Sequence, residues 1–472
     1  MKIEIRHGGS VIIVEYDHDV TLHRAIADAG IALYAPCGGE GRCGCCRVTA
    51  RGALSEPDEI EKKRLGGAEL SDGMRLACRA YAVGDCTVTV DGIIADTVSG
   101  ANIRAGNVGV AVDIGTTTVA ASLVDMETGR RIAEAVTPNP QSVWGADVIS
   151  RISAAERVGV GELRRLVRGC VDGLRRRLGA PLDAPTVIVG NTTMLSLWAG
   201  IDPAPIGRAP FSPPVLFGET VDGAYLPRCV SGYVGADAVA SVISAISMLH
   251  PGEDAVIVDV GTNGEVISYR GGVMYACAAA AGPALEGAGI SCGMTATDGA
   301  IESVMIRGGE LMCGVIGGGE ARGICGSGLV DAAACLLRFG IIDRSGYMAE
   351  PFRLMDGVFV TPDDIRALQL AKGAIRAAID FAVGDGAPPK LFLSGGFGSG
   401  LSVRSCVRIG MIPARLGESV SIIGNGALRG AELMLTDGVT RKRADELARG
   451  AVYTDLSGNT GFSAKFVGAL EF

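Results

Sequence analysis

The chain has few histidines, few lysines and no long apolar run, and each shortage excludes a class of protein. All four histidines lie at or before residue 250, and none follows the G-x-S-x-G match at residues 289–293, so a serine hydrolase triad in the usual chain order is excluded. None of the seven lysines is followed by Ser or Thr, which rules out a P-loop. No apolar stretch reaches the roughly 18 residues that a membrane-spanning helix needs.

Positive charge is also scarce. The 52 Asp and Glu residues outnumber the 43 Lys and Arg residues, which leaves a net charge of −9 at pH 7. Such a chain has no global positive field to hold nucleic acid or an anionic membrane surface. The apolar run near the N-terminus is too short for a signal peptide. We therefore expect a cytoplasmic protein that binds neither nucleic acid nor membrane.

Glycine and cysteine, in contrast, are abundant. Glycine accounts for 70 of the 472 residues, about twice its usual share, and follows no collagen-like period, so it must serve folded backbone. In a reducing compartment, 14 cysteines indicate metal or redox chemistry rather than disulfides. The length predicts two or three domains.

The pattern along the chain changes near residue 108. Two alternating apolar runs, a short helix, a cysteine-rich loop and a closing strand form the expected N-terminal domain, residues 1–93. Small and polar residues predict a linker at 94–107. Apolar strands that alternate with glycine turns and amphipathic helices then predict an α/β domain over 108–472, in two lobes of approximately 108–250 and 251–472.

Five cysteines cluster near the N-terminus, and four of them are candidate metal ligands. Cys37, Cys43 and Cys46 are separated by five and then two residues, and Cys78 follows at a distance. This spacing resembles that of plant-type ferredoxins, whose loop supplies three thiolates and whose later strand supplies the fourth to a [2Fe–2S] cluster. A zinc site is the alternative, but zinc sites usually contain two close cysteine pairs and only one is present. Cys45 lies between ligands and is interpreted as a spectator.

Two similar turns follow strands in the second domain. The segments 111–125 and 257–269 each read as strand, Asp-x-Gly-Thr turn and second strand. A glycine at such a turn lets backbone N–H groups approach phosphate, and the carboxylates can hold a magnesium ion through its waters. One such turn alone is equally compatible with an ordinary β-turn, but the duplication favours a triphosphate clamp. The candidate residues are Asp113, Gly115, Thr116, Thr117 and Thr118 in the first turn, and Asp259, Gly261, Thr262, Asn263 and Gly264 in the second.

A third glycine turn is the candidate adenosine site. The strand at 391–393 leads into Ser394 and the turn residues Gly395, Gly396, Phe397 and Gly398, where a flat base could approach closely. Gly326 and Ser327 are further candidates for lining the nucleotide.

The residue that orients the attacking water is less well determined. No histidine lies in these motifs, so a carboxylate must act as the general base. Asp237 is the first candidate and Glu265 the second. A solvent-exposed helix aspartate explains Asp237 equally well.

These turns resemble the motifs of the acetate kinase, sugar kinase, Hsp70 and actin superfamily. The segments 113–118, 259–265 and 394–398 resemble its two phosphate motifs and its adenosine motif, and 235–245 and 424–433 resemble its two helices that connect the lobes. The resemblance implies an α+β, ferredoxin-like (β-grasp) N-terminal domain followed by a two-lobed α/β actin-like ATPase domain.

The combination of the two domains resembles the reductive activators of corrinoid-dependent enzymes. Further similarity lies at 138–152, 190–194, 276–290, 321–331 and 367–375. The resemblance implies ATP-dependent transfer of one electron from a [2Fe–2S] cluster to a Co(II) corrinoid, which regenerates Co(I). It implies ATP, Mg²⁺ and the cluster as cofactors, and a corrinoid methyl-carrier protein and an upstream low-potential electron donor as partners; it also allows a homodimer.

Two alternatives stay open at this point. The chain could be an ATP-driven electron donor to a non-corrinoid enzyme, although such activators usually place their cluster at the interface of an ATPase dimer. It could also be a redox-sensing, actin-like binding module that transfers no electron.

Overall fold

A computed structural model describes residues 1–7, 10–29, 31, 46–90, 107–145, 147–260, 264–384, 389–395, 400–456 and 458–472. Within these ranges the chain forms two compact units, residues 1–226 and 227–472, which are described separately. No helix in the described ranges is both long and apolar enough to cross a bilayer.

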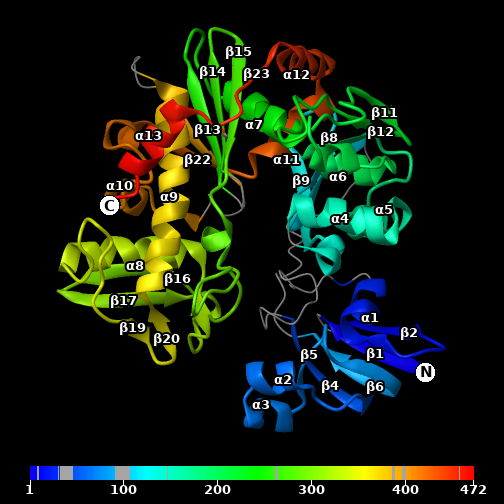
Figure 1. The fold of residues 1–472 in the computed structure, drawn as a ribbon. Coiled ribbons are helices and arrows are strands. Elements are labelled where there is room, and N and C mark those ends of the chain that lie inside the picture. The colour runs from blue at the N-terminus through cyan, green and yellow to red at the C-terminus, as the bar shows by residue number, and fades with distance from the viewer. Residues whose placement is uncertain are drawn as a thin grey trace. The chain divides into compact units, whose positions relative to one another are not determined.

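The first unit begins with a mixed sheet in the strand order β2-β1-β6-β4-β5, with β3 paired to β6 (Figure 1). β1 and β2 form an antiparallel hairpin, whereas β1 and β6 run parallel. The strands are β1 (Lys2–His7), β2 (Ser10–Glu15), β3 (Val20–Thr21), β4 (Arg47–Leu54), β5 (Met74–Leu76) and β6 (Tyr81–Thr89). The helices are α1 (Leu22–Asp28), α2 (Glu59–Arg64) and α3 (Gly67–Ser71).

The sequence pattern explains how this sheet and its helix meet. Alternating residues of β1 and β6 and the apolar stripe of α1 form one buried cluster, which includes Ile3, Ile5, Leu22, Ile26, Leu76 and Val88. The Thr21 hydroxyl accepts a hydrogen bond from the Arg24 backbone N–H at 3.2 Å and so caps the start of α1. β6 begins at Tyr81, and its first half pairs with both β3 and β4.

The rest of the first unit is an α/β layer around a second sheet in the order β11-β12-β10-β7-β8-β9. Its strands are β7 (Val108–Ile114), β8 (Thr118–Asp125), β9 (Arg131–Pro138), β10 (Thr186–Gly190), β11 (Glu219–Val221) and β12 (Ala224–Leu226). Its helices are η1 (Pro140–Trp144), α4 (Val148–Val158), α5 (Val160–Arg177), α6 (Thr192–Ala199) and η2 (Ala204–Gly207).

The second unit repeats this arrangement around the sheet β22-β21-β13-β14-β15-β23. In both sheets an antiparallel meander (β7-β8-β9, β13-β14-β15) has a parallel strand, β10 or β21, beside its first member. The internal similarity seen in the sequence therefore corresponds to a structural duplication. The strands are β13 (Ala255–Val260), β14 (Gly264–Arg270), β15 (Val273–Ala279), β21 (Lys390–Ser394), β22 (Val420–Gly424) and β23 (Val452–Tyr453).

The helices of the second unit pack around this sheet, and two of them cross at very short range (Figure 1). At the crossing of α7 and α11, a Cβ atom on Gly430 would lie 1.9 Å from the Ala240 carbonyl oxygen, so only glycine fits. The helices are α7 (Ala236–Ile246), η3 (Pro283–Glu286), η4 (Ile316–Gly318), α8 (Gly326–Phe339), α9 (Pro362–Val383), α10 (Val403–Arg408), η6 (Ala414–Ser419), α11 (Gly426–Thr436), α12 (Gly438–Gly450) and α13 (Thr460–Gly468).

Two small sheets complete the second unit. One has the order β17-β16-β18 and packs against α8, and the other is the hairpin β19-β20. Their strands are β16 (Ala300–Arg307), β17 (Glu310–Val315), β18 (Gly323–Ile324), β19 (Phe352–Met355) and β20 (Val358–Val360).

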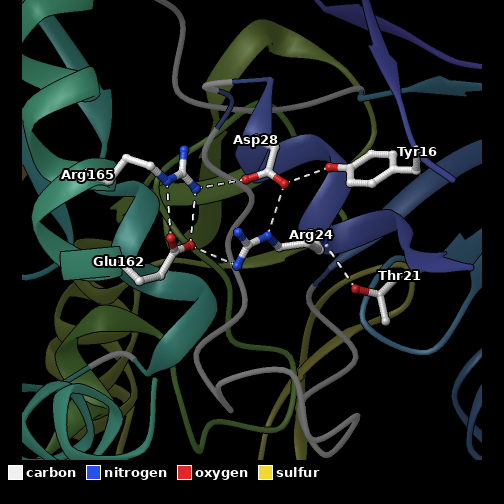
Figure 2. A network of polar contacts seen from close by, with 6 residues as sticks. All are labelled: Tyr16, Thr21, Arg24, Asp28, Glu162 and Arg165. Atoms are coloured by element: carbon white, nitrogen blue, oxygen red, sulfur yellow. Dashed lines mark hydrogen bonds and ion pairs between the residues drawn. The ribbon is translucent and has the colours of Figure 1, made fainter. Parts of the chain in front are cut away.

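An ion-pair cluster joins the N-terminal sheet domain to α5 within the first unit (Figure 2). The Arg24 guanidinium bridges Asp28 at 3.0 Å and Glu162 at 2.8 Å, and Arg165 bridges the same two carboxylates at 2.9 and 3.1 Å. The Tyr16 hydroxyl donates to Asp28 at 2.6 Å. Burial raises the pKa of Asp28, but the hydrogen bonds from Tyr16, Arg24 and Arg165 outweigh it and hold that pKa below its usual value.

Candidate functional site

Two of the four candidate cluster ligands lie side by side. Cys46 precedes β4 and Cys78 follows β5, and their sulfur atoms are 3.2 Å apart. Both side chains are nearly buried, and the Ala77 N–H donates to the Cys46 carbonyl at 2.8 Å, which holds the two segments together. A thiolate–metal bond of about 2.3 Å in a tetrahedral site places two sulfurs roughly 3.8 Å apart, so this pair fits two ligands of one metal ion. Cys37 and Cys43 lie outside the described residues.

A buried ion pair supports this cysteine pair. Glu61 on α2 accepts two hydrogen bonds from the Arg75 guanidinium, at 3.0 and 2.8 Å, and a third from the Leu76 N–H at 3.0 Å. Both charged side chains are nearly inaccessible to water. Because a bidentate pair fixes both position and angle, it holds the segment that leads from β5 to Cys78. The sequence analysis missed this pair, since its members lie 14 residues apart with no local pattern.

The first predicted phosphate turn closes on itself after β7. Asp113 is the penultimate residue of β7. The Gly115 N–H donates to the Thr118 carbonyl at 2.9 Å, and a Cβ atom at Gly115 would lie only 2.7 Å from that oxygen. Thr116, Thr117 and Thr118 are half-buried, so their polar groups remain accessible to a ligand.

Three side chains that the sequence analysis did not single out hold this turn. The Asn139 amide donates to the Gly115 carbonyl at 2.8 Å, the Arg151 guanidinium donates to the Thr116 carbonyl at 3.0 Å, and the Asn191 amide donates to the Thr116 hydroxyl at 3.0 Å. These residues lie in the segments 138–152 and 190–194, which carried part of the family resemblance without a physical role. Their similarity to the family was the available signal.

Three carboxyl groups, on β13, β14 and α7, interact with one another. Asp259 near the end of β13 and Glu265 on β14 are direct cross-strand partners, so their side chains share one face of the sheet. Asp237 lies in the first turn of α7. Burial first, and then the charge of Asp259, raises the pKa of Asp237 to about 7. Burial raises the pKa of Asp259 to about 6, although a hydrogen bond with Ser394 opposes the shift. Burial and both aspartates raise the pKa of Glu265 well above its usual value.

Together, the carboxylates of Asp237, Asp259 and Glu265 have the properties of a cation site. All three side chains are half-buried. Like charges held close together and partly shielded from water destabilise one another, so the site favours binding a positive charge. Among the described residues, no three His, Cys, Asp or Glu side chains converge closely enough to ligate a metal ion directly. A magnesium ion that keeps its waters and meets the carboxylates through them fits both observations. Gly261, Thr262 and Asn263 lie outside the described residues, whereas Gly264 is buried at the start of β14.

The start of the predicted adenosine turn reaches the same carboxylates. Gly395 has a φ angle of +94°, and a Cβ atom there would lie 2.5 Å from an oxygen of Asp259. The Ser394 hydroxyl lies 3.5 Å from that of Ser241 on α7. The end of β21 therefore joins Asp259 to α7. Gly396, Phe397 and Gly398 lie outside the described residues.

Gly326 and Ser327 form the buried first turn of α8. The Ser327 hydroxyl donates to the Glu302 carbonyl at 2.8 Å, so its proton is engaged within the protein. A Cβ atom at Gly400 would lie 3.5 Å from the Ser327 hydroxyl oxygen, which brings the segment after the adenosine turn next to α8.

Comparison with known proteins relates both sites to one family. Family models match residues 5–83 ("2Fe-2S iron-sulfur cluster binding domain"), 108–250 ("RACo middle region") and 253–472 ("C-terminal domain of RACo the ASKHA domain"). The ASKHA domain is the actin-like ATPase fold that the turns predicted. The middle-region model covers the residues that we expected to form the first lobe.

Similarity extends to individual proteins of related description. A solved structure, "Reductive activator for corrinoid,iron-sulfur protein", is 26% identical, covers 100% of this chain and 98% of its own, and superposes with a TM-score of 0.67. "Corrinoid activation enzyme RamQ" of Eubacterium limosum is 31% identical over 69% of this chain and 64% of its own length. "[Co(II) methylated amine-specific corrinoid protein] reductase" of Methanosarcina barkeri is 26% identical over 69% of this chain and 70% of its own.

The match to RamQ spans slightly less than two thirds of that relative. The match to the solved activator, by contrast, spans both chains almost completely. Together, the three consecutive family models and this fold similarity show that the chain belongs to the RACo family, with an N-terminal [2Fe–2S] ferredoxin-type domain and a C-terminal ASKHA domain.

Proposed function

We propose that the chain is an ATP-dependent reductive activator that transfers one electron to the Co(II) corrinoid of a partner protein and so regenerates Co(I). The observation that carries the proposal is the presence of two sites in one chain of this family. The adjacent sulfur atoms of Cys46 and Cys78 support one half of a thiolate site, and the interacting carboxylates of Asp237, Asp259 and Glu265 support a cation site. A redox site and an ATP site in one chain suit a reaction that couples the two.

The energetics explain why both sites are needed. The [2Fe–2S] cluster, when held by Cys37, Cys43, Cys46 and Cys78, supplies a single electron at a potential near ~−400 mV. For a one-electron step, every ~59 mV by which the acceptor lies below the donor costs ~1.4 kcal/mol. A gap of several hundred millivolts therefore prevents passive transfer. Binding and hydrolysis of ATP can change which conformation and which partner contacts are favoured.

The proposed roles of the nucleotide-site residues follow from their chemistry. The N–H and hydroxyl groups of Thr116, Thr117 and Thr118 would bind phosphate. Asp113 in the first turn and Asp259 before the second are the carboxylates that would meet Mg²⁺ through its waters. Asp237 orients and deprotonates the attacking water, because a base works best when its pKa lies near the working pH. Glu265 is the alternative base. Gly261, Thr262, Asn263, Gly396, Phe397 and Gly398 stay predicted nucleotide-binding residues from the sequence.

The test mixes anaerobically reduced protein with a Co(II) corrinoid carrier protein and follows Co(I) absorbance with and without Mg-ATP. We expect Co(I) to form only with ATP. Formation of Co(I) at the same rate without ATP would contradict the role of the nucleotide. If ATP is hydrolysed but no Co(I) forms with any corrinoid carrier, the chain serves another acceptor or only senses redox state, and the proposal fails. The upstream donor, the cytoplasmic location and a homodimer remain predictions from the sequence.

A further inference from the structure

Arg151 is fully buried on α4, yet no carboxylate pairs with it in the described part of the chain. Its guanidinium donates to three neutral acceptors: the Gly145 carbonyl, the Gln141 side-chain carbonyl at 3.1 Å, and the Thr116 carbonyl at 3.0 Å. Buried charges are normally paired, because an isolated charge in the protein interior costs several kcal/mol. A buried guanidinium without a paired carboxylate therefore favours a ligand of opposite charge nearby.

Asp147, the carboxylate whose charge acts on Arg151, forms no ion pair with it. Asp147 acts on Arg151 from one helical turn away, but its oxygens accept hydrogen bonds from the Ser150 N–H and hydroxyl at 2.8 and 2.7 Å. Burial lowers the pKa of Arg151 to about 9, and the charge of Asp147 partly offsets this. Arg151 therefore stays positively charged at neutral pH, directly behind the first phosphate turn.

The same contacts direct the N–H groups of that turn. In a trans peptide the C=O and the following N–H point in opposite directions. Asn139 holds the Gly115 carbonyl and Arg151 holds the Thr116 carbonyl, so the N–H groups of Thr116 and Thr117 point away from these two anchors. Among the described residues, neither N–H has a hydrogen-bond acceptor. Two successive N–H groups without a protein acceptor are available to bind an anion.

We propose that Arg151 is a positioning residue for nucleotide phosphate. It fixes the first phosphate turn through the Thr116 carbonyl and places a positive charge without a paired carboxylate behind that turn. This inference rests on the proposed function in one respect, that the chain binds a nucleotide. It goes beyond that function by assigning a second source of phosphate affinity to a residue that does not touch the ligand.

The first experiment separates charge from geometry at Arg151 itself. Affinities for adenosine, AMP, ADP and ATP are measured by calorimetry on the full-length protein. For Arg151→Met, which removes both charge and hydrogen bonds, we expect a loss that grows with the number of phosphates and reaches about tenfold or more for ATP. Arg151→Lys keeps the charge and should retain the dependence on phosphate number while losing affinity. Arg157→Met, an exposed charge on the same helix, is the matched control and should change little.

The second experiment cancels the charge and leaves Arg151 in place. Gln141→Glu puts a carboxylate where Arg151 now meets an amide oxygen, 3.1 Å away, and Gln141→Met is its control. Both variants lose the hydrogen bond from the Gln141 amide to the Leu163 carbonyl. They differ in that Gln141→Glu keeps an acceptor for Arg151 and adds a negative charge, whereas Gln141→Met removes the acceptor and adds no charge. We expect Gln141→Glu to bind ATP more weakly than Gln141→Met, with adenosine bound equally by both.

The outcomes are separable. If the wild-type chain binds ATP but the losses at Arg151 and Gln141 are equal for adenosine and ATP, the inference is wrong and the proposed function stands. If the wild-type chain binds no nucleotide, the proposed function fails first. Melting temperatures of all variants are recorded, and where Arg151→Met does not fold, the comparison between the two Gln141 variants still decides the question.

Discussion

Cys46 and Cys78 are 32 positions apart in the chain, yet their sulfur atoms lie 3.2 Å from each other. Two buried thiols at this distance without a disulfide are the arrangement that a metal centre requires. The spacing of the cysteines in the sequence predicted the partners. The short distance, however, depends on the pairing of β4 with β5 and on the Glu61–Arg75 pair, which have no local sequence pattern.

Replacing Cys78 with serine should remove the visible absorption and the reduced-state EPR signal of a [2Fe–2S] cluster. The reason is that one iron loses a thiolate that the fold places beside Cys46. ATP binding should persist, since the nucleotide turns belong to other sheets. The matched control is Cys86→Ser, a buried cysteine on β6 of the same domain, which should keep the cluster. An unchanged spectrum in the Cys78 variant would refute the ligand set.

We expect the carboxylates of Asp237, Asp259 and Glu265 to lower the stability of the folded protein while they serve the proposed nucleotide site. The pKa of Asp259 is raised to about 6, so the folded state loses stability relative to the unfolded state as the pH rises above the ordinary aspartate value. We expect Asp259→Asn to increase the free energy of unfolding of the nucleotide-free protein by roughly 1–2 kcal/mol at neutral pH. Its melting temperature should rise accordingly. The same variant should lose ATP hydrolysis while the cluster spectrum is unchanged.

Differential scanning calorimetry and a phosphate-release assay on the same preparation check this prediction. Retained hydrolysis would remove Asp259 from the proposed site. A lower melting temperature in the absence of nucleotide would show that the carboxylate is stabilising, and that burial is not the dominant influence on its pKa.

The backbones of α7 and α11 approach each other so closely that only glycine fits at position 430. A methyl group on Gly430 would lie 1.9 Å from the Ala240 carbonyl oxygen, and backbone cannot yield that much without separating the helices. Since α7 also carries Asp237, a change at this crossing should reach the nucleotide site.

Gly430→Ala should therefore destabilise the protein by about 2–4 kcal/mol and lower ATPase activity, although the residue does not contact nucleotide. Gly169→Ala on α5 is the control, because nothing lies within 4 Å of the added carbon and alanine favours a helix. Denaturant unfolding measures both variants. Equal stability of the Gly430 variant and the wild type would show that the helices separate at little cost.

Sequence reasoning finds candidate site residues where they lie close together in the chain. The Asp-x-Gly-Thr turns, the glycine-rich adenosine strand and the small residues of the connecting helices were all visible as short patterns. It failed for Asn139, Arg151 and Asn191, which reach the first turn from 24 to 75 positions away. A buried arginine without a carboxylate partner cannot be recognised until the fold shows what surrounds it.

At the scale of the whole molecule, the ion-pair cluster of Arg24, Asp28, Glu162 and Arg165 connects the ferredoxin-type domain to α5 (Figure 2). Arg165→Glu should place three carboxylates around Arg24 and release the domain, so that the radius of gyration from small-angle scattering increases. High salt should have the same effect on the wild type, because exposed pairs are screened. Arg176→Glu at the end of α5 is the control.

The charge-swapped double variant Asp28→Arg with Arg165→Glu should restore part of the contact. An unchanged radius of gyration in Arg165→Glu at low salt would show that the ion pairs do not hold the two domains together.

The account as a whole claims that electron transfer and ATP use are coupled in one chain. The most direct test is a single-turnover experiment in which prereduced protein meets a Co(II) corrinoid carrier, while the EPR signal of the reduced cluster and the absorbance of Co(I) are followed together. We predict that, with Mg-ATP, one Co(I) appears for each reduced cluster lost, and that without ATP both signals remain constant. Formation of Co(I) without ATP, or loss of the cluster signal without formation of Co(I), would contradict the account.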